Sequence, residues 1–368
     1  MGGSACCRAA ASIRAIGEEG LTDGNSTLQM NARLFGVLLL ALGCGLSLWA
    51  QGGVDRTTLA ILVNDADPLS VQVGQYYQQA RKLEARQLIH LNFPAGKSRL
   101  SPEAFAAIRA QIERATPDFI QAYAITWSRP YRVGCMSITT AVAAGFDAAF
   151  CPPEGVVCAP TRRLDYFDSA VTDPHRQLGL RPAMMLAGNN LEEVKRLIDR
   201  GIAADGSHPA GSAYLLVTAD RARSVRALGY GEVFRVARPP IRPRRIEADW
   251  IEHEQDVLFY FTGTAWVRQL DSNRFLPGAV GDHLTSAGGQ LDGQKQMPAL
   301  AWLSAGATGS YGTVSEPCNF PEKFPRPAVL IDHYQRGETL LEAYWKSVAS
   351  PGQGLFIGEP LARPFGER

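Results

Sequence analysis

The chain lacks an excess of charge of either sign. Its 368 residues include 37 Lys and Arg against 36 Asp and Glu, so the formal net charge is +1. Proteins that bind nucleic acid or an anionic membrane surface through their overall field carry a clear excess of basic residues. The balance of charges therefore excludes binding of that kind, and we expect no nucleic acid among the partners.

Several motifs that identify common enzymes are also missing. The sequence contains no G-x-x-x-x-G-K-[ST], which a P-loop nucleotide site requires. The run GATGSYG at 306–312 has the spacing GxxGxxG, unlike the GxGxxG of dinucleotide-binding turns, and favours a tight loop after a strand. Thr308 stands where a nucleophile elbow around Ser310 needs its first glycine. His253 has no second histidine four residues later, which excludes a zincin helix.

Sequence patterns that are typical of a metal site are similarly few. The pairs Asp282-His283 and Asp332-His333 contain suitable side chains. Adjacent residues on a helix or strand point apart, however, so each pair would supply only one ligand. We therefore expect no metal and no other cofactor.

Long hydrophobic runs are scarce, and one of them lies near the N-terminus. Residues 30–50 read MNARLFGVLLLALGCGLSLWA, in which Arg33 precedes an apolar stretch that ends before Ala50. A short basic region, an apolar region and a small residue are typical of a cleaved signal peptide, and the stretch is short for a membrane span. We predict an exported protein, periplasmic or extracellular, that begins near Gln51 and keeps no stable membrane span.

The residues around this segment leave two alternatives open. Residues 1–29 show no apolar periodicity, so they are either a disordered leader or an over-extended start. Cleavage before Cys44, as in a lipoprotein, is the alternative to cleavage near Gln51.

Cysteine is rare as well, and four cysteines follow the predicted cleavage point: Cys135, Cys151, Cys158 and Cys318. An even number in an exported chain suggests disulfide bonds. Cys151 and Cys158 flank the turn-rich sequence PPEGVV, which favours a local bridge and leaves Cys135 for Cys318. Four buried thiols, or a free Cys318, are the alternatives.

Apolar runs alternate with amphipathic segments along the rest of the chain. This alternation predicts an α/β fold with a mostly parallel sheet flanked by helices. We expect strands at 59–63, 88–93, 119–127, 182–187, 213–218 and 257–263, and a final strand and turn at 355–360. Helices are expected at 68–82, from 101, at 191–204 and at 328–345, the last broken near Gly337.

The same pattern divides the chain into parts. Residues 54–127 form a first α/β half, 128–181 an irregular insertion that contains cysteines, and 182–365 a second half with the candidate site. The basic, proline-rich sequence RVARPPIRPRR at 235–245 is either a solvated linker or a patch for an anionic ligand.

Four stretches of the second half resemble an uncharacterised family of exported bacterial proteins: FYFTGTAWV, NRFLPGAVGDHLTSAGG, AGATGSYGTVSEPCNFPEKFP and TLLEAYWKSVASPGQGLFIGEPLARPF. The resemblance extends from about Leu59 to Phe365. It implies export and carries no established reaction.

A more remote similarity is to caspase-like cysteine peptidases of the gingipain type. In those proteins one strand ends in His-Gly, the next ends in the nucleophilic Cys, and a Gly-Ala strand, a helix after Gly-Glu and a closing turn follow. Thr264 stands at the position of that histidine and Ser286 at that of the cysteine. Threonine cannot act as the base that activates a thiol. The resemblance therefore implies a catalytically degenerate hydrolase fold that is used for binding.

The carboxyl ends of neighbouring parallel strands converge, so ligands bind beside them. We accordingly expect one concavity lined by Thr264, His283, Ser286 and Tyr311, with Asp282 and Glu316 nearby. Thr264, Tyr311 and Glu316 are the candidate binding residues, for an unknown ligand or a cell-envelope protein. The alternative is an active hydrolase, of peptidase or esterase type, that uses Asp282 and His283 with Ser286 or Cys318.

Overall fold

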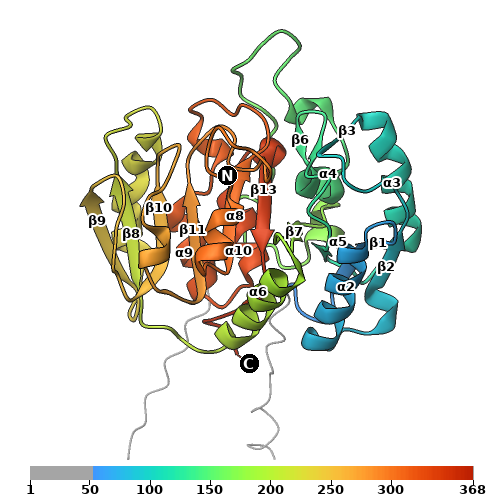
Figure 1. Ribbon diagram of the computed structural model, residues 1–368, viewed down its shortest axis with the longest axis horizontal. Helices are drawn as coiled ribbons and strands as arrows, with labels where there is room; N and C mark the ends of the chain where they lie inside the picture. Colours follow the sequence, from blue (N-terminus) through green and yellow to red (C-terminus); the bar gives the residue numbers. More distant parts are fainter. Residues whose placement is uncertain (1–52, 368) are drawn as a thin grey trace, which may run out of the picture. The chain divides into compact units, whose positions relative to one another are not determined.

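A computed structural model describes residues 53–367 of the chain. The predicted signal peptide at 30–50 and the leader at 1–29 lie outside the described residues. Ten strands form one sheet in the order β2-β1-β4-β7-β13-β12-β11-β10-β8-β9 (Figure 1). The strands are β1 (Leu59–Asn64), β2 (Leu88–Leu91), β4 (Ala122–Ile125), β7 (Ala183–Met185), β8 (Ser212–Val217), β9 (Arg242–Glu247), β10 (Val257–Thr262), β11 (Phe275–His283), β12 (Gly309–Thr313) and β13 (Gly354–Gly358).

The sheet consists of two groups of five parallel strands that run in opposite directions. The N-terminal half-sheet contains β2, β1, β4, β7 and β13, and the C-terminal half-sheet contains β12, β11, β10, β8 and β9. They meet where β12 and β13 pair antiparallel, with Tyr311 opposite Phe356. The predicted α/β class with a mostly parallel sheet is confirmed. The carboxyl ends of the two half-sheets lie at opposite edges.

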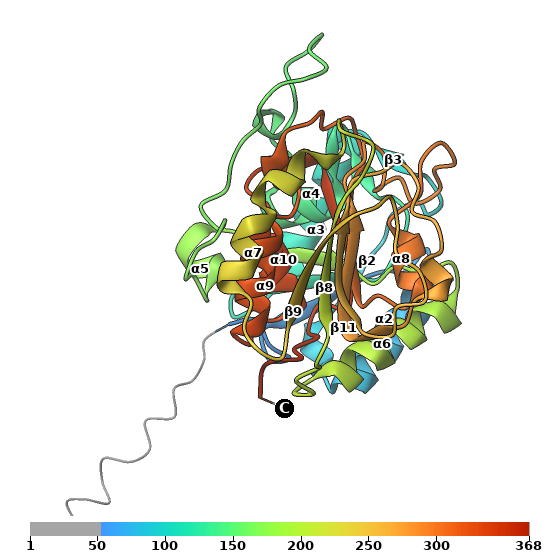
Figure 2. The same ribbon diagram turned by 90° about the vertical axis from the view of Figure 1, so that its left-hand side faces the viewer.

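Helices cover both faces of this sheet. They are α2 (Pro68–Arg81), α3 (Pro102–Ala115), α4 (Ile138–Ala144), α5 (Pro174–Leu178), α6 (Leu191–Ala204), α7 (Tyr230–Val236), α8 (Leu300–Ala305), α9 (Pro327–Gln335) and α10 (Leu340–Ser347). Successive residues of a strand pack into different apolar clusters. One cluster includes residues of α2, α7, α9 and α10, a second includes residues of α3 and α8, and a third includes residues of α8. Around β8–β11, α7, α9 and α10 lie on one side and α8 on the other (Figure 2). The predicted break near Gly337 separates α9 from α10, and its φ of 88° suits glycine.

The two half-sheets repeat one topology. In each, the second strand lies outside the first and the next strand lies on the inner side, so β2-β1-β4 matches β9-β8-β10. The repeat extends to the strand ends and the loops that follow them, ILVNDADPLSV from β1 and LLVTADRARSV from β8. Asn64 N–H donates to the Ser70 hydroxyl (2.9 Å), and Thr218 N–H donates to the Ser224 hydroxyl (3.1 Å). Each half-sheet therefore has its own reversal of strand order, the usual place for a ligand.

The structure contains two disulfides, as expected for an exported chain, but their pairing differs from the prediction. Cys135 is bonded to Cys151 and Cys158 to Cys318, so the predicted Cys151–Cys158 bridge is wrong. The turn-rich segment between Cys151 and Cys158 does not close on itself. It belongs to the loop that protrudes at the top of Figures 1 and 2, where Val157 is 67% exposed.

Two segments have more regular structure than their sequences suggest. The stretch 128–181 contains α4, α5 and two short strands, β5 (Arg132–Val133) and β6 (Met136–Ser137); β5 pairs with β6 on one side and with β3 (Arg99–Leu100) on the other. The glycine-rich run at 306–312, expected to be a loop, contains most of β12. No helix in residues 53–367 is long and apolar enough to cross a membrane.

The basic segment 235–245 is not simply a linker, because it ends in the edge strand β9. Arg242 lies 2.7 Å from Asp256, and Arg244 lies 3.4 Å from Glu254. Most residues of β9 are exposed, so the strand lacks an apolar run. Charged side chains on an outer strand discourage pairing with another chain.

Candidate functional site

The residues at the positions of the peptidase dyad follow two adjacent parallel strands. Thr264 comes after β10 and Ser286 after β11, and Thr262 is paired with His283 in the ladder. Both residues are partly exposed at the same edge of the sheet. The Thr264 hydroxyl donates to the carbonyl of Trp266 (3.2 Å), and the Ser286 carbonyl accepts from the Thr313 hydroxyl (3.1 Å).

His283 is buried beneath this edge and both of its ring nitrogens are occupied. Trp302 Nε1 donates to Nδ1 (3.0 Å), so Nε2 carries the proton and donates to the Met297 carbonyl (3.0 Å). Burial lowers the pKa of His283 to about 4, against the opposing effect of the Met297 hydrogen bond. The imidazole is therefore neutral at pH 7. Neither ring nitrogen is available to accept a proton from Ser286. Cys318 forms a disulfide and therefore has no thiol to act as a nucleophile.

Asp282 faces the opposite side of the sheet from His283, because successive strand residues alternate. Arg226 Nη1 lies 2.5 Å from its Oδ1, and Arg226 Nη2 donates to the Thr262 carbonyl (2.9 Å). Burial raises the pKa of Asp282, although Arg226 opposes that rise. The buried pair fastens the 3₁₀ turn Ser224–Gly229 to β10 and β11.

The remaining predicted residues do not join His283 in one concavity. Tyr311 is buried on the side of Asp282, and its hydroxyl donates to the Lys323 carbonyl (2.5 Å). Glu316 is exposed and accepts from the N–H of Cys318 (2.8 Å). Of the predicted set, Thr264 and Ser286 thus remain accessible together at the carboxyl edge.

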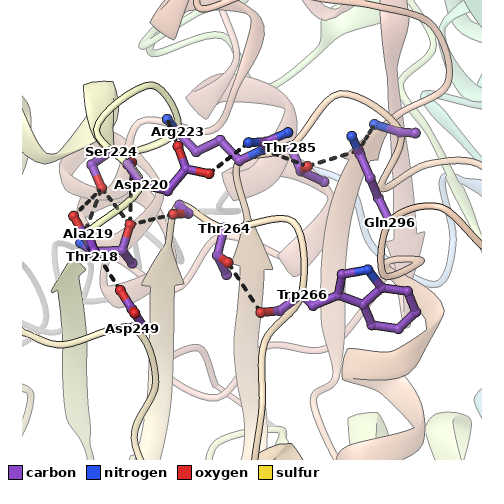
Figure 3. A network of polar contacts seen from close by, with 12 residues as sticks. Thr218, Ala219, Asp220, Arg223, Ser224, Asp249, Thr264, Trp266, Thr285 and Gln296 are labelled. Atoms are coloured by element: carbon purple, nitrogen blue, oxygen red, sulfur yellow. Dashed lines mark hydrogen bonds and ion pairs between the residues drawn. The ribbon is translucent and has the colours of Figure 1, made fainter.

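A polar cluster lies at this edge and includes Thr264 together with residues that the sequence did not predict (Figure 3). Arg223 Nη1 lies 2.7 Å from Asp220, and Arg223 Nε donates to the Thr285 hydroxyl (3.1 Å). That hydroxyl donates in turn to Gln296 Oε1 (2.9 Å). The side chains of Arg223 and Asp220 are 28% and 31% exposed. The guanidinium is therefore fixed on two sides and still open to solvent. We call Asp220, Arg223, Thr264, Thr285 and Gln296 the carboxyl-edge cluster.

The loop after β8 holds Arg223 in place. The Thr218 hydroxyl donates to the Gly263 carbonyl (2.6 Å), and Ala219 N–H donates to Asp249 (2.8 Å). A Cβ on Gly263 would lie 2.0 Å from the carbonyl oxygen of Arg223, so only glycine allows this contact. In the sequence, the only indication of this site was the polar segment TADRARS directly after an apolar strand. The residues that this segment contacts lie in three other loops.

The described residues contain no group of three His, Cys, Asp or Glu side chains that could hold a metal ion. The chemistry available at this edge is hydrogen bonding and ion pairing by the carboxyl-edge cluster.

Because His283 is buried in its neutral form, the free energy of unfolding should depend on pH. Its pKa is about 4 in the folded protein and 6.5 in the unfolded chain, so the unfolded state binds more protons between these values. The contribution of this residue to the free energy of unfolding should fall by about 2 kcal/mol from pH 7 to pH 5. Urea titrations at both pH values measure the loss. The His283→Gln variant should lose less over this interval; an equal loss in both proteins contradicts the prediction.

No known protein family, curated protein or solved structure matches this chain in the comparisons made.

Proposed function

We propose that this chain is an exported, non-hydrolytic protein of caspase-like descent that binds a peptide at the carboxyl-edge cluster. The order of elements supports the descent. Thr264 and Ser286 follow adjacent parallel strands, β12 comes next, a helix begins after Gly337-Glu338, and β13 precedes the closing turn. This is the order that the resemblance to gingipain-type peptidases implies.

The state of His283 is the observation that carries the proposal of binding without hydrolysis. A nucleophilic hydroxyl or thiol needs a base within hydrogen-bond reach. Trp302 and Met297 occupy both nitrogens of this imidazole. The alternative of a hydrolase built on His283 with Ser286 or Cys318 would require these contacts to break.

Arg223 supplies the means of binding. Its guanidinium is oriented by Asp220 and Thr285 and remains partly exposed, so it can donate to carbonyl or carboxylate oxygens of a ligand. Because its geometry is set before the ligand arrives, little side-chain entropy is lost on binding. An extended peptide offers such oxygens at regular intervals.

The test uses a fluorescein-labelled casein digest and the exported protein. Fluorescence polarisation should show saturable binding, and mass spectrometry should show intact peptides after prolonged incubation. Arg223→Ala should weaken binding at least about tenfold, the usual effect of removing a charge-assisted hydrogen bond. Arg245→Ala, which removes an exposed arginine of β9, is the matched control and should bind as the wild type does.

Two results would overturn the proposal. One is the absence of peptide binding, or binding that Arg223→Ala leaves unchanged. The other is cleavage of the peptides that disappears in a His283→Ala variant, which would establish the hydrolase alternative.

A further inference from the structure

A groove runs along the α8 side of the sheet and begins beside the carboxyl-edge cluster, where Trp266 lies two residues after Thr264. It consists of a hollow of about 550 Å³ and one of about 350 Å³, which share Asn189, Leu291 and Leu300 in their walls. Both volumes are in the range of small-molecule sites. The smaller hollow lies at the carboxyl ends of the N-terminal half-sheet, where Asp67 follows β1 and Ser128 follows β4. It thus occupies the reversal point between these two strands.

Trp266 lines the larger hollow and exposes 51% of its surface. Its backbone is held on both sides. The Thr264 hydroxyl donates to its carbonyl (3.2 Å), and Met297 N–H donates to the Ala265 carbonyl (2.9 Å). Val267, the next residue, is buried. The indole is therefore an apolar surface that is open to solvent but carried by a fixed segment.

The larger hollow also has polar groups in its wall. Gln269, Asp271 and Ser304 line the same hollow, and the apolar side chains Leu270 and Met297 form part of its wall. Amide, carboxylate and hydroxyl groups can each donate to or accept from neutral hydroxyls. An aromatic face beside such groups suits a ligand with one apolar face and a polar rim.

The charges along the groove disfavour a polyanion. Asp67 and Asp271 are acidic, whereas Arg129 is the basic residue among those that line the two hollows. Arg129 itself lies 3.5 Å from Asp292. Nucleic acids and acidic polysaccharides need a basic groove, so the ligand that fits this one is neutral.

We infer that the α8 groove binds a neutral oligosaccharide. One sugar ring stacks its C–H face on Trp266, and its hydroxyls bond to Gln269 and Asp271. The chain continues past Leu300 into the smaller hollow beside Ser128. A sugar ring has the required combination of an apolar face and a hydroxyl rim, and the length of the groove accommodates more than one ring.

Calorimetric titration of the exported protein with the tetramers of N-acetylglucosamine, cellulose, starch and xylan tests the inference. One of the four should bind, and Trp266→Ala should weaken that binding at least tenfold. Phe234→Ala is the matched control, since Phe234 is also 51% exposed but lies on α7, on the other side of the sheet. It should bind as the wild type does.

Three outcomes would overturn the inference: no tetramer binds at about 10 mM, Trp266→Ala binds as well as the wild type, or the casein peptides occupy the groove in a Trp266-dependent manner. Arg223→Ala separates this site from the peptide site, because it should leave saccharide binding unchanged. Failure at one site is thus distinguishable from failure at the other.

Discussion

Removing the Cys158–Cys318 disulfide by serine substitution at both positions should lower the free energy of unfolding by about 5 kcal/mol. The two cysteines are 160 residues apart, so the bond removes much of the conformational entropy of the unfolded chain. Under the loop-entropy relation the cost of losing such a bond grows with the logarithm of the loop length. Urea unfolding under oxidising conditions measures the loss.

The Cys135–Cys151 pair provides the matched comparison. Its cysteines are 16 residues apart, so serine substitution at both should cost about 3 kcal/mol. Peptide mapping without reductant verifies that the other bond stays intact in each variant. A larger loss for the short loop than for the long one, or a loss below about 1 kcal/mol for both, contradicts the prediction.

Replacing Glu359 by alanine should destabilise the fold by about 3 kcal/mol, the lower end of the usual cost of breaking a buried ion pair, because Arg81 keeps its second ion pair with Asp205. Glu359 follows β13 and is fully buried. Its carboxylate accepts from the Tyr77 hydroxyl (2.7 Å) and from Arg81 Nε (2.9 Å) on α2. Burial alone would lower the pKa of Arg81, but the Glu359 carboxylate overrides this effect and raises it.

Glu192→Ala is the control for the loss of an ion pair as such. Glu192 lies 3.0 Å from Lys195 on the surface of α6, where its side chain is 69% exposed. Such pairs contribute little, so this variant should lose less than about 0.5 kcal/mol. Denaturant midpoints and slopes of the three proteins give the comparison. If Glu359→Ala is no less stable than Glu192→Ala, the buried pair does not hold β13 against α2.

The apolar strands of the sheet could be predicted from the sequence because burial on both faces leaves a continuous apolar run. The prediction of 59–63 corresponds to Leu59–Asn64, and that of 257–263 to Val257–Thr262. The apolar pattern did not predict β9, because an exposed edge strand needs no apolar residues. The apolar pattern did not predict β11 and β12, which only the resemblance implied, because both contain glycines, which usually indicate turns.

The glycines of β11 and β12 serve close packing rather than turns. A Cβ on Gly281 would lie 2.4 Å from the Trp302 ring, and one on Gly312 would lie 2.3 Å from the backbone of Gly288. They are required by close packing between elements that are distant in sequence, and no local pattern reveals such contacts. The repeated topology was hidden for a similar reason. It is carried by strand order and by one recurring hydrogen bond to a serine, rather than by many matching residues.

The candidate site was predictable only in part. The carboxyl ends of β10 and β11 were the correct place to expect accessible polar residues, as Thr264 and Ser286 show. Alternation along a strand already implied that Asp282 and His283 point to opposite sides. Thr285 and Gln296, which complete the site around Arg223, lie in the loop after β11, far in sequence from the loop of Arg223 after β8, so their meeting depends on the tertiary fold.

The antiparallel junction of β12 and β13 also determines how the molecule would bear mechanical load. Ligands at the carboxyl ends of the two half-sheets pull on opposite edges, in directions parallel to the strands. Five residue pairs, from Gly309–Gly358 to Thr313–Gly354, cross the junction. A force in these directions places the hydrogen bonds between β12 and β13 under shear. In shear the bonds bear the force together, whereas a force perpendicular to the strands would break them one after another. The central strand pair is thus the element that would transmit tension applied along the strands at the two opposite edges.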